Sequence, residues 1–501
     1  MTNPLYDTLF GRHAGNGEVF LYLPEGGTIT YAGFVEQAGQ MAQALTSLDL
    51  VPGDRVAVQI TKSHHALAVY AACVQAGLVF LPLNPAYTPD EVAYFVDNSG
   101  AALLVCEDAT LAVLSPIARQ AGTRVQTLNA DGTGSLGQRA AAQTDRFATV
   151  SREEGDLAAM LYTSGTTGRS KGAMLSQRNL LSNAQVLAEC WRFTDADVLL
   201  HALPIFHTHG LFVATNIALL TGGAMVLLPK LDIDRIIDWL PRSTAMMGVP
   251  TFYTRLLADA RFTSDLVGHM RLFISGSAPL LAETHKQFEA RTGHRILERY
   301  GMTETNMNTS NPYDGERRAG TVGFPLPRVE LKVCDPHTGA LCGPGEIGVI
   351  EVRGDNVFQG YWQMPEKTAA ELRADGFFIT GDLGFVDADG YVTIVGRNKD
   401  LIISGGYNIY PKEVELILDD QPGVLESAVI GVPHPDFGET PVAVLVADGD
   451  LDEAAVAAAV KHSLAGFKCP RAYVVVEALP RNTMGKVQKN VLRDRCKDRF
   501  A

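Results

Sequence analysis

Short apolar runs alternate with helical patterns through the first half of the chain. Residues 55–60 and 78–83 predict buried strands, and residues 62–77 between them predict a helix. Residues 101–105 and 224–228 predict two further buried strands. Strands that alternate with helices are typical of α/β layers, so we expect largely parallel sheets.

The pattern changes at about residue 320. Segments such as 345–352 and 390–395 are β-branched and bounded by Gly and Pro, which predicts a smaller β-rich subdomain. After residues 396–400 the α/β alternation resumes to the end of the chain. We therefore expect an α/β protein of two domains. A large N-terminal domain over residues 1–396 combines layered α/β sheets with the β-rich subdomain, and a small α/β C-terminal domain covers residues 397–501.

Composition narrows the class of protein. The chain has 501 residues, of which 46% are hydrophobic and 20% charged, as in soluble globular proteins with more than one domain. Its formal net charge is −14, with the acidic residues spread along the chain. Nucleic acids and anionic membranes require a basic surface, so neither is an expected partner. An anionic ligand in a locally basic cleft remains compatible with this charge.

The cysteines and the apolar segments indicate the cellular compartment of the protein. The seven cysteines are scattered, without CxxC pairs or zinc-ligand spacing to His, which predicts buried free thiols and a reducing compartment. The first residues have no secretion signal pattern. The longest apolar stretch, residues 66–83, is interrupted by Gln75, Gly77 and Pro82, which disfavours a membrane span. We expect a cytoplasmic protein.

A Gly- and hydroxyl-rich segment follows the apolar run 157–161. Residues 162–172 read Tyr-Thr-Ser-Gly-Thr-Thr-Gly-Arg-Ser-Lys-Gly. Glycines let backbone N–H groups approach an anion, hydroxyls donate to its oxygens, and Lys171 adds a positive charge, so the segment suits a phosphate group. Its spacing differs from the GxxxxGK[ST] of P-loop proteins. A flexible loop without a ligand is the alternative interpretation.

Three other segments are weaker evidence for a ligand site when each is taken alone. Residues 298–304 offer Tyr300 to stack on a purine and Glu304 to hold Mg²⁺, but could equally be a strand end and a turn. Asp382 after Gly381 is typical of a turn, and would also suit two ribose hydroxyls. Lys486 in the segment 480–486 would ordinarily be a solvated lysine.

Together, the order and separation of the four segments resemble the adenylate-forming superfamily of acyl-CoA synthetases, peptide-synthetase adenylation domains and luciferases. The resemblance runs over essentially the whole chain and includes residues 201–210, 275–279 and 402–411. Within that superfamily, four stretches look like the malonyl-CoA synthetase family almost letter for letter; these are residues 248–257, 268–278, 297–308 and 479–489.

The resemblance implies an ATP-dependent acid–thiol ligase. Such an enzyme forms malonyl-CoA from malonate and CoA through malonyl-AMP and releases AMP and pyrophosphate. ATP, Mg²⁺, coenzyme A and a small dicarboxylic acid are then the expected ligands. A ligase for another small acid such as methylmalonate, an adenylation domain that loads a carrier protein, and a nucleotide sensor without catalysis remain alternatives.

The resemblance also implies site residues. ATP phosphates would contact Thr163, Ser164, Gly165, Thr166, Thr167, Gly168 and Lys171, with Thr303 near the α-phosphate and Glu304 near Mg²⁺. The adenine site would comprise Gly276, Ser277, Ala278, Glu298, Tyr300, Gly301 and Met302. The ribose would contact Asp382 and Arg397, the mobile C-terminal domain would turn about the hinge residue Lys399, and Ser404, Gly405 and Gly406 would face the CoA tunnel. Lys486 would be the catalytic lysine, and a lysine acetyltransferase that removes its charge is a further expected partner.

The resemblance implies an acid pocket beside His207 and the segment 275–277, which contains Ser277. A dicarboxylate needs a cation for its distal charge, because burying an unpaired carboxylate is costly. Arg271 precedes the apolar run 272–274 and alternates onto the same face as Ser275, a position typical of a solvated surface arginine. The resemblance to the malonyl-CoA synthetase family, which uses an arginine here, implies instead that Arg271 is this cation, with Arg299 in reserve. Gly301 stands where acetate-specific relatives carry a wall-forming Trp, which implies a pocket larger than acetate requires.

Overall fold

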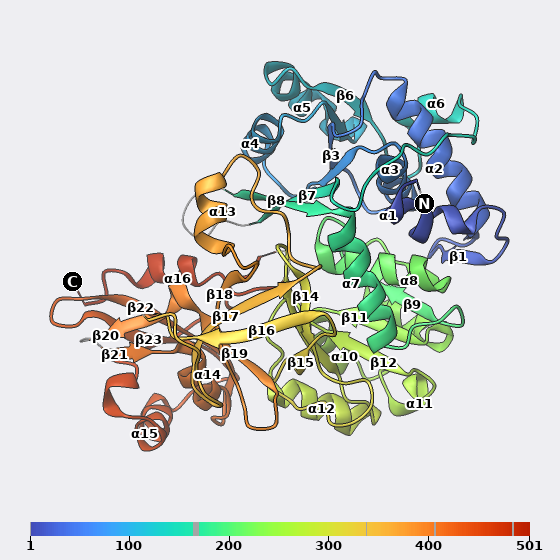
Figure 1. The fold of residues 1–501 in the computed structure, drawn as a ribbon. Coiled ribbons are helices and arrows are strands. Elements are labelled where there is room, and N and C mark those ends of the chain that lie inside the picture. Colours follow the sequence, from blue (N-terminus) through green and yellow to red (C-terminus); the bar gives the residue numbers. More distant parts are fainter. Residues whose placement is uncertain (1, 164–169, 337, 405–406, 483–484, 501) are drawn as a thin grey trace. The chain divides into compact units, whose positions relative to one another are not determined.

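The structure is a computed structural model that describes residues 2–163, 170–336, 338–404, 407–482 and 485–500 (Figure 1). The chain divides into two compact units. The first comprises Met1–Gly320, Phe324–Glu330 and Arg353–Phe378, and the second comprises Thr321–Gly323, Leu331–Val352 and Ile379–Ala501. The domain boundary expected at residues 396 and 397 stays a prediction.

A six-stranded sheet of the first unit has the order β6-β5-β3-β4-β7-β8. Its strands are β3 (Arg55–Gln59), β4 (Val79–Pro82), β5 (Leu103–Cys106), β6 (Arg124–Thr127), β7 (Leu157–Thr163) and β8 (Lys171–Ser176). All pairs are parallel except β7 with β8. Its helices are α2 (Tyr31–Thr46), α3 (His64–Gln75), α4 (Pro89–Ser99), α5 (Asp108–Gln120) and α6 (Ser135–Ala141). The predicted strands at 55–60, 78–83 and 101–105 and the helix at 62–77 are confirmed.

The residue pattern explains these elements. Strands β4 and β5 are buried at every position, as expected for parallel strands covered on both faces. Helix α3 begins where the Ser63 hydroxyl accepts a hydrogen bond from the Ala66 N–H. Helix α4 begins with a reciprocal capping box between Thr88 and Glu91 and ends at Gly100, which adopts the left-handed conformation.

A nine-stranded sheet forms the rest of the first unit, in the order β15-β14-β13-β12-β11-β9-β10-β1-β2. Its strands are β1 (Val19–Tyr22), β2 (Thr28–Thr30), β9 (Val198–His201), β10 (Ala224–Leu227), β11 (Ala245–Gly248), β12 (Leu272–Ser275), β13 (Leu297–Met302), β14 (Asn306–Ser310) and β15 (Phe324–Pro325). The other helices of the first unit include α1 (Pro4–Leu9), α7 (Gln177–Cys190), the π-helix η2 (His209–Thr215), α8 (Asn216–Thr221), α9 (Ile233–Trp239), α10 (Pro250–Leu257), α11 (Ser264–Val267), α12 (Ala282–Thr292) and α13 (Pro365–Glu371). The carboxyl ends of the parallel strands β9, β11, β12 and β13 lie at one edge. Ligands of open α/β sheets bind at this edge.

The second unit has two smaller sheets. One has the order β16-β17-β18-β19, with β16 (Val329–Cys334), β17 (Gly348–Gly354), β18 (Phe378–Val386) and β19 (Val392–Arg397), and it contains the expected β-rich segments. The other contains β20 (Ile402–Ser404), β21 (Tyr407–Ile409), β22 (Val424–His434), β23 (Gly438–Ala447) and β24 (Ala472–Val475). Helices α14 (Pro411–Asp419), α15 (Glu453–Ser463) and α16 (Lys489–Cys496) accompany it.

Alternation along β22 and β23 builds two cores in this unit. Val429 and Leu445 pack with residues of α14 and α15, whereas Ile430 and Val444 pack with Leu492 of α16. Because successive side chains of a strand point to opposite faces, the sheet is apolar on both sides and needs helices on each. In neither unit does a described helix have the length and apolar character needed to cross a membrane. All seven cysteines are free thiols.

Candidate active site

The carboxyl ends of β11, β12 and β13 place the expected acid-pocket residues together. Gly276 and Ser277 directly follow β12, and Arg299 lies within β13. The Ser277 backbone has φ 71°, a left-handed conformation uncommon for a residue with a side chain. Its hydroxyl oxygen lies 3.2 Å from Nδ1 of His209, at the start of the π-helix η2. Non-glycine residues in this conformation gather at functional sites.

Arg299 is buried, and none of the described carboxylates forms an ion pair with it. Its side chain is 2% exposed, and its Nε and Nη2 atoms find no hydrogen-bond partner among the described residues. A Cβ atom placed on Gly276 would lie 2.4 Å from the guanidinium carbon, so glycine gives Arg299 its room. Burial lowers the pKa of Arg299 to about 9, which still leaves a cation at neutral pH. A buried cation of this kind fits an anionic ligand.

Burial favours the neutral form of two histidines near the start of η2, His207 and His209. Burial lowers the pKa of the half-buried His207 to about 4. Burial and the nearby Arg299 charge also lower the pKa of His209 far below its ordinary value. The Nε2 atom of His209 is buried without a partner among the described residues. Each ring therefore offers one N–H donor and one acceptor.

Sequence reasoning missed the support behind these histidines. The Lys62 ammonium lies 2.8 Å from Nδ1 of His201 and donates, also at 2.8 Å, to the carbonyl oxygens of His201 and Leu203. Nε2 of His201 lies 2.8 Å from the carbonyl of Gly210 in η2. The pair thus fixes the chain that carries His209. The sequence pointed to this region only through the resemblance of residues 201–210 and through His207.

Arg271 has a different environment. Its Nε and Nη2 atoms donate to the two carboxylate oxygens of Asp197, both at 2.7 Å, and Nη1 donates to the Trp191 carbonyl at 2.9 Å. The guanidinium also lies over the Phe193 ring at 4.6 Å. Its donors are engaged within the protein, so Arg271 matches a structural ion pair better than the predicted substrate clamp.

The structure describes the two ends of the expected phosphate-binding segment, at Thr163 and from residue 170 onward. Thr163 ends β7 and pairs in register with Lys171, which opens β8. The predicted residues Ser164, Gly165, Thr166, Thr167 and Gly168 lie outside the described residues. The Lys171 ammonium lies 4.0 Å from the centroid of the Tyr361 ring and 3.4 Å from Oε2 of Glu371.

Tyr361 contacts both Lys171 and Glu304. The Tyr361 hydroxyl lies 2.9 Å from Oε1 of Glu304 and 2.7 Å from Oε2 of Glu371. Burial would raise the pKa of Glu371, but Lys367, Tyr361 and Lys171 reverse this and lower it. No sequence pattern pointed to Tyr361 or Glu371, since they lie in an ordinary loop and helix.

The expected adenine residues lie along β13 and the turn after β12. Tyr300, Gly301 and Met302 end β13 and, with Thr303 and Ala278, are partly exposed. Glu298 accepts the Leu280 N–H at 3.1 Å. A Cβ atom on Gly301 would lie 1.9 Å from the Asn306 carbonyl, at the irregularity between β13 and β14. Close approach of two strands therefore requires this glycine, apart from any effect on pocket size.

The second unit groups the remaining candidates. Asp382 lies within β18 and pairs in register with Arg397, whose Nε lies 2.8 Å from the carboxylate. The interpretation of Asp382 as a turn residue is therefore wrong.

The Arg397 charge, with burial, lowers the pKa of Lys486 to about 8, although part of Lys486 is exposed. Lys399 lies in the short helix η4 (Asn398–Asp400), and Ser404 ends β20. Gly405 and Gly406 lie outside the described residues.

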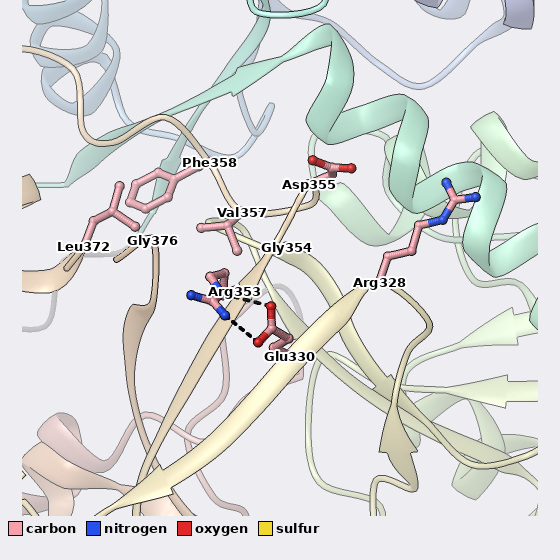
Figure 2. Close-up of a pocket in the computed structure, with 9 residues that line it drawn as sticks. All are labelled: Arg328, Glu330, Arg353, Gly354, Asp355, Val357, Phe358, Leu372 and Gly376. Carbon is pink, nitrogen blue, oxygen red and sulfur yellow. Dashed lines mark hydrogen bonds and ion pairs between the residues drawn. The ribbon is translucent and has the colours of Figure 1, made fainter. Parts of the chain in front are cut away.

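A surface pocket of about 460 Å³ lies elsewhere on the first unit (Figure 2). Its walls include Val357, Phe358 and Leu372. Figure 2 shows Arg353 turned toward Glu330, to which its Nε donates at 2.9 Å. The charge of Arg353 is thereby neutralised. The pocket gathers none of the predicted site residues.

Comparisons with known proteins identify the family. Residues 11–362 match the AMP-binding enzyme family and residues 413–486 match the AMP-binding enzyme C-terminal domain. A malonate–CoA ligase of Arabidopsis thaliana is 34% identical over 91% of this chain and 80% of its own length. A feruloyl-CoA synthase of an Amycolatopsis species is 36% identical over 94% of both chains. The crystal structure of ATP-bound MatB from Rhodopseudomonas palustris is 55% identical, covers 100% of both chains and superposes with a TM-score of 0.98. The chain belongs to the AMP-binding enzyme family.

Proposed function

We propose that this protein is an AMP-forming malonate–CoA ligase that consumes ATP. The observation that carries the choice of acid is Arg299, a buried cation whose Nε and Nη2 atoms have no hydrogen-bond partner among the described residues. Malonate has a second carboxylate to offer this cation, whereas a monoacid leaves it unpaired. The malonate–CoA ligase among the relatives supports the same choice.

Adenylation converts the acid into an acyl donor. One malonate carboxylate attacks the α-phosphorus of ATP, the bond to pyrophosphate breaks, and malonyl-AMP forms. The CoA sulfur then attacks the activated carbonyl, AMP departs, and the thiol proton is released. The first step brings two anions together, so positioning and charge neutralisation supply most of the catalysis. We assign the distal carboxylate to Arg299 rather than Arg271, because Asp197 already engages Arg271.

The first unit supplies the remaining contacts of the acid and the phosphates. His207 and Ser277 would orient the malonate, and Lys171 would neutralise the β- and γ-phosphates. Mg²⁺ holds water and phosphate oxygens alongside few protein carboxylates, so Glu304 alone suits it. In keeping with this, the described residues contain no group of three or more His, Cys, Asp or Glu that could hold a metal ion. Bound Mg²⁺ would offset the charge that the phosphates carry.

The second unit would supply the ribose contacts and the catalytic lysine. Asp382 is 4% exposed and paired with Arg397, which suits acceptance of two ribose hydroxyls. Lys486 stands within the electrostatic influence of both residues, so it would reach the α-phosphate of a nucleotide held there. Rotation of residues 397–501 about Lys399 would then bring the 404–406 segment to CoA.

Two wider proposals follow. Acetylation of Lys486 would remove its charge, so a lysine acetyltransferase is a proposed regulator of adenylation. The seven free cysteines support a reducing compartment, and we propose the cytoplasm.

A product assay tests the function. The protein is incubated with malonate, Mg²⁺-ATP and either CoA or a phosphopantetheinylated carrier protein, and AMP, pyrophosphate and thioester are quantified. We expect one AMP and one pyrophosphate per malonyl-CoA, with CoA as the better acceptor. ADP as the nucleotide product, or preference for the carrier, would contradict the proposal.

A further inference from the structure

One short segment of the first unit is hydrogen-bonded to the backbone of Glu304 and to the strand that begins at Lys171. The Phe358 N–H donates to the Glu304 carbonyl at 2.8 Å. Three residues on, Tyr361 forms a β-bridge with Ala173, and the Trp362 N–H donates to the Gly172 carbonyl at 2.8 Å. Residues 358–362 therefore run beside β8, which begins at Lys171 (Figure 1). The backbone alone fixes Tyr361 between Lys171 and Glu304.

The side chains complete the connection. The Lys171 ammonium lies over the Tyr361 ring, and the Tyr361 hydroxyl contacts the carboxylates of both Glu304 and Glu371. Glu371 ends helix α13, where Lys367 one turn earlier pairs with it at 2.6 Å. Glu371 is thus held by Lys367 and Tyr361 at short distances and by Lys171 at the longer 3.4 Å.

These contacts restrict the direction of the Lys171 side chain but leave its ammonium group able to bind a further anion. An ammonium at 3.4 Å from a carboxylate and over an aromatic face is attracted by both, yet keeps donors for a further anion. A tyrosine hydroxyl carries one hydrogen and donates to one carboxylate at a time. If Glu304 turns toward a cation, the hydroxyl can donate to Glu371 instead, so its hydrogen bond is exchanged rather than lost.

We propose that Glu371 and Tyr361 are positioning residues for the pyrophosphate end of ATP, since they hold the Lys171 ammonium and the Glu304 carboxylate in place before the nucleotide binds. This inference rests on the proposed function, because the ligands of Lys171 and Glu304 are assigned there. It concerns the β- and γ-phosphates only. AMP and malonyl-AMP lack those groups, so their binding should not depend on Glu371 or Tyr361.

The test separates these two kinds of ligand. Binding of Mg²⁺ with α,β-methylene-ATP, which cannot release pyrophosphate, and binding of AMP are measured by calorimetry for Glu371→Gln and Tyr361→Phe. Glu366→Gln, at an exposed site in the first turn of the same helix, is the matched control for charge. We expect both variants to bind the ATP analogue about 10- to 100-fold more weakly and AMP within about twofold of the wild type. The conversion of supplied malonyl-AMP and CoA to thioester should be unchanged.

Several outcomes would overturn the inference. Equal weakening of AMP and the ATP analogue would mean that Glu371 supports the fold alone. Tighter binding of the analogue by Glu371→Gln would mean that Glu371 competes with ATP for Lys171. Because Tyr361→Phe keeps the ring under Lys171, it tests the hydroxyl even if Glu371→Gln folds poorly. Failure of the proposed function would instead appear in the wild type, as malonate that is not activated while both nucleotides still bind.

Discussion

Arg271 and Arg299 carry the same cation but differ in what surrounds it. Arg271 forms a bidentate pair with Asp197, whose side chain is 6% exposed, so removing the arginine leaves a buried carboxylate unpaired. Arg299 has no such partner among the described residues. An uncompensated buried charge lowers stability, and a ligand of opposite charge recovers part of that cost. The surroundings of Arg271 thus suit a structural role, and those of Arg299 suit the binding of an anionic ligand.

Replacing Lys486 tests whether its single positive charge serves the adenylation step. Lys486→Ala should slow malonate-dependent pyrophosphate release by about 10²–10³, the usual effect of losing one charge-stabilising donor. Conversion of supplied malonyl-AMP and CoA to thioester should continue. The Lys486 amine is charged below its pKa of about 8, so kcat/KM for pyrophosphate release should fall as the pH rises through that value.

The variant itself supplies the control, because Lys486→Ala should lack this alkaline decline. Rapid-quench measurement of the two half-reactions between pH 6 and 10 checks both statements. Equal loss of both half-reactions would show that Lys486 does not serve adenylation alone.

The sequence predicted candidates such as Lys171 and Glu304 because local chemistry and a family resemblance pointed to them. It could not predict Tyr361 or Glu371, since their importance arises from contacts with residues far away in the chain. The Tyr361 hydroxyl meets Glu304 across 57 positions, and Lys171 meets Glu371 across 200. The family resemblance pointed to Arg271 rather than Arg299, and the sequence does not show that Asp197 occupies the donors of Arg271.

Among the elements, strands and helices with strong apolar patterns were predicted well. Strand β3 and helix α3 lie within two residues of their expected bounds, since burial and a local N-cap determine them. The local sequence left a turn as the ordinary alternative for Asp382, because local propensity does not reveal that its strand is stabilised by pairing with Arg397 of β19.

The helix η4 provides a test of the proposed hinge. Proline at Lys399 would fix φ near −65° and remove an amide donor, so the torsions needed for rotation are restricted. Lys399→Pro should leave pyrophosphate release within about threefold of wild type and slow thioester formation at least about tenfold. Lys399→Ala removes the charge but keeps the torsions, and should support both steps. Normal thioester formation by Lys399→Pro would refute the hinge.

For the whole molecule, the net charge of −14 gives no hint of an anionic substrate. We propose instead that local features of the first unit recognise it, namely the buried Arg299 and the neutral His209 near it. The family resemblance predicted the fold and the reaction, because the relevant segments follow one another along the chain. The choice of arginine required the folded structure.

The central claim is that Arg299 selects a dicarboxylic acid, and kcat/KM for a panel of acids tests it most directly. Malonate, methylmalonate, succinate, acetate and propionate are compared on wild type, Arg299→Met and Arg271→Ala. We expect the wild type to prefer malonate, to accept methylmalonate more weakly and to use the others poorly, since a monoacid leaves Arg299 unpaired and succinate places its second carboxylate too far along the pocket.

Arg299→Met should lose malonate activity by roughly 30- to several-thousand-fold, the effect of truncating one partner of a buried charge pair, while acetate activity changes little. Arg271→Ala should be less stable to heat but keep the ratio of malonate to acetate activity. A wild type that prefers acetate, equal loss of all acids in Arg299→Met, or loss of malonate preference in Arg271→Ala alone would contradict the account.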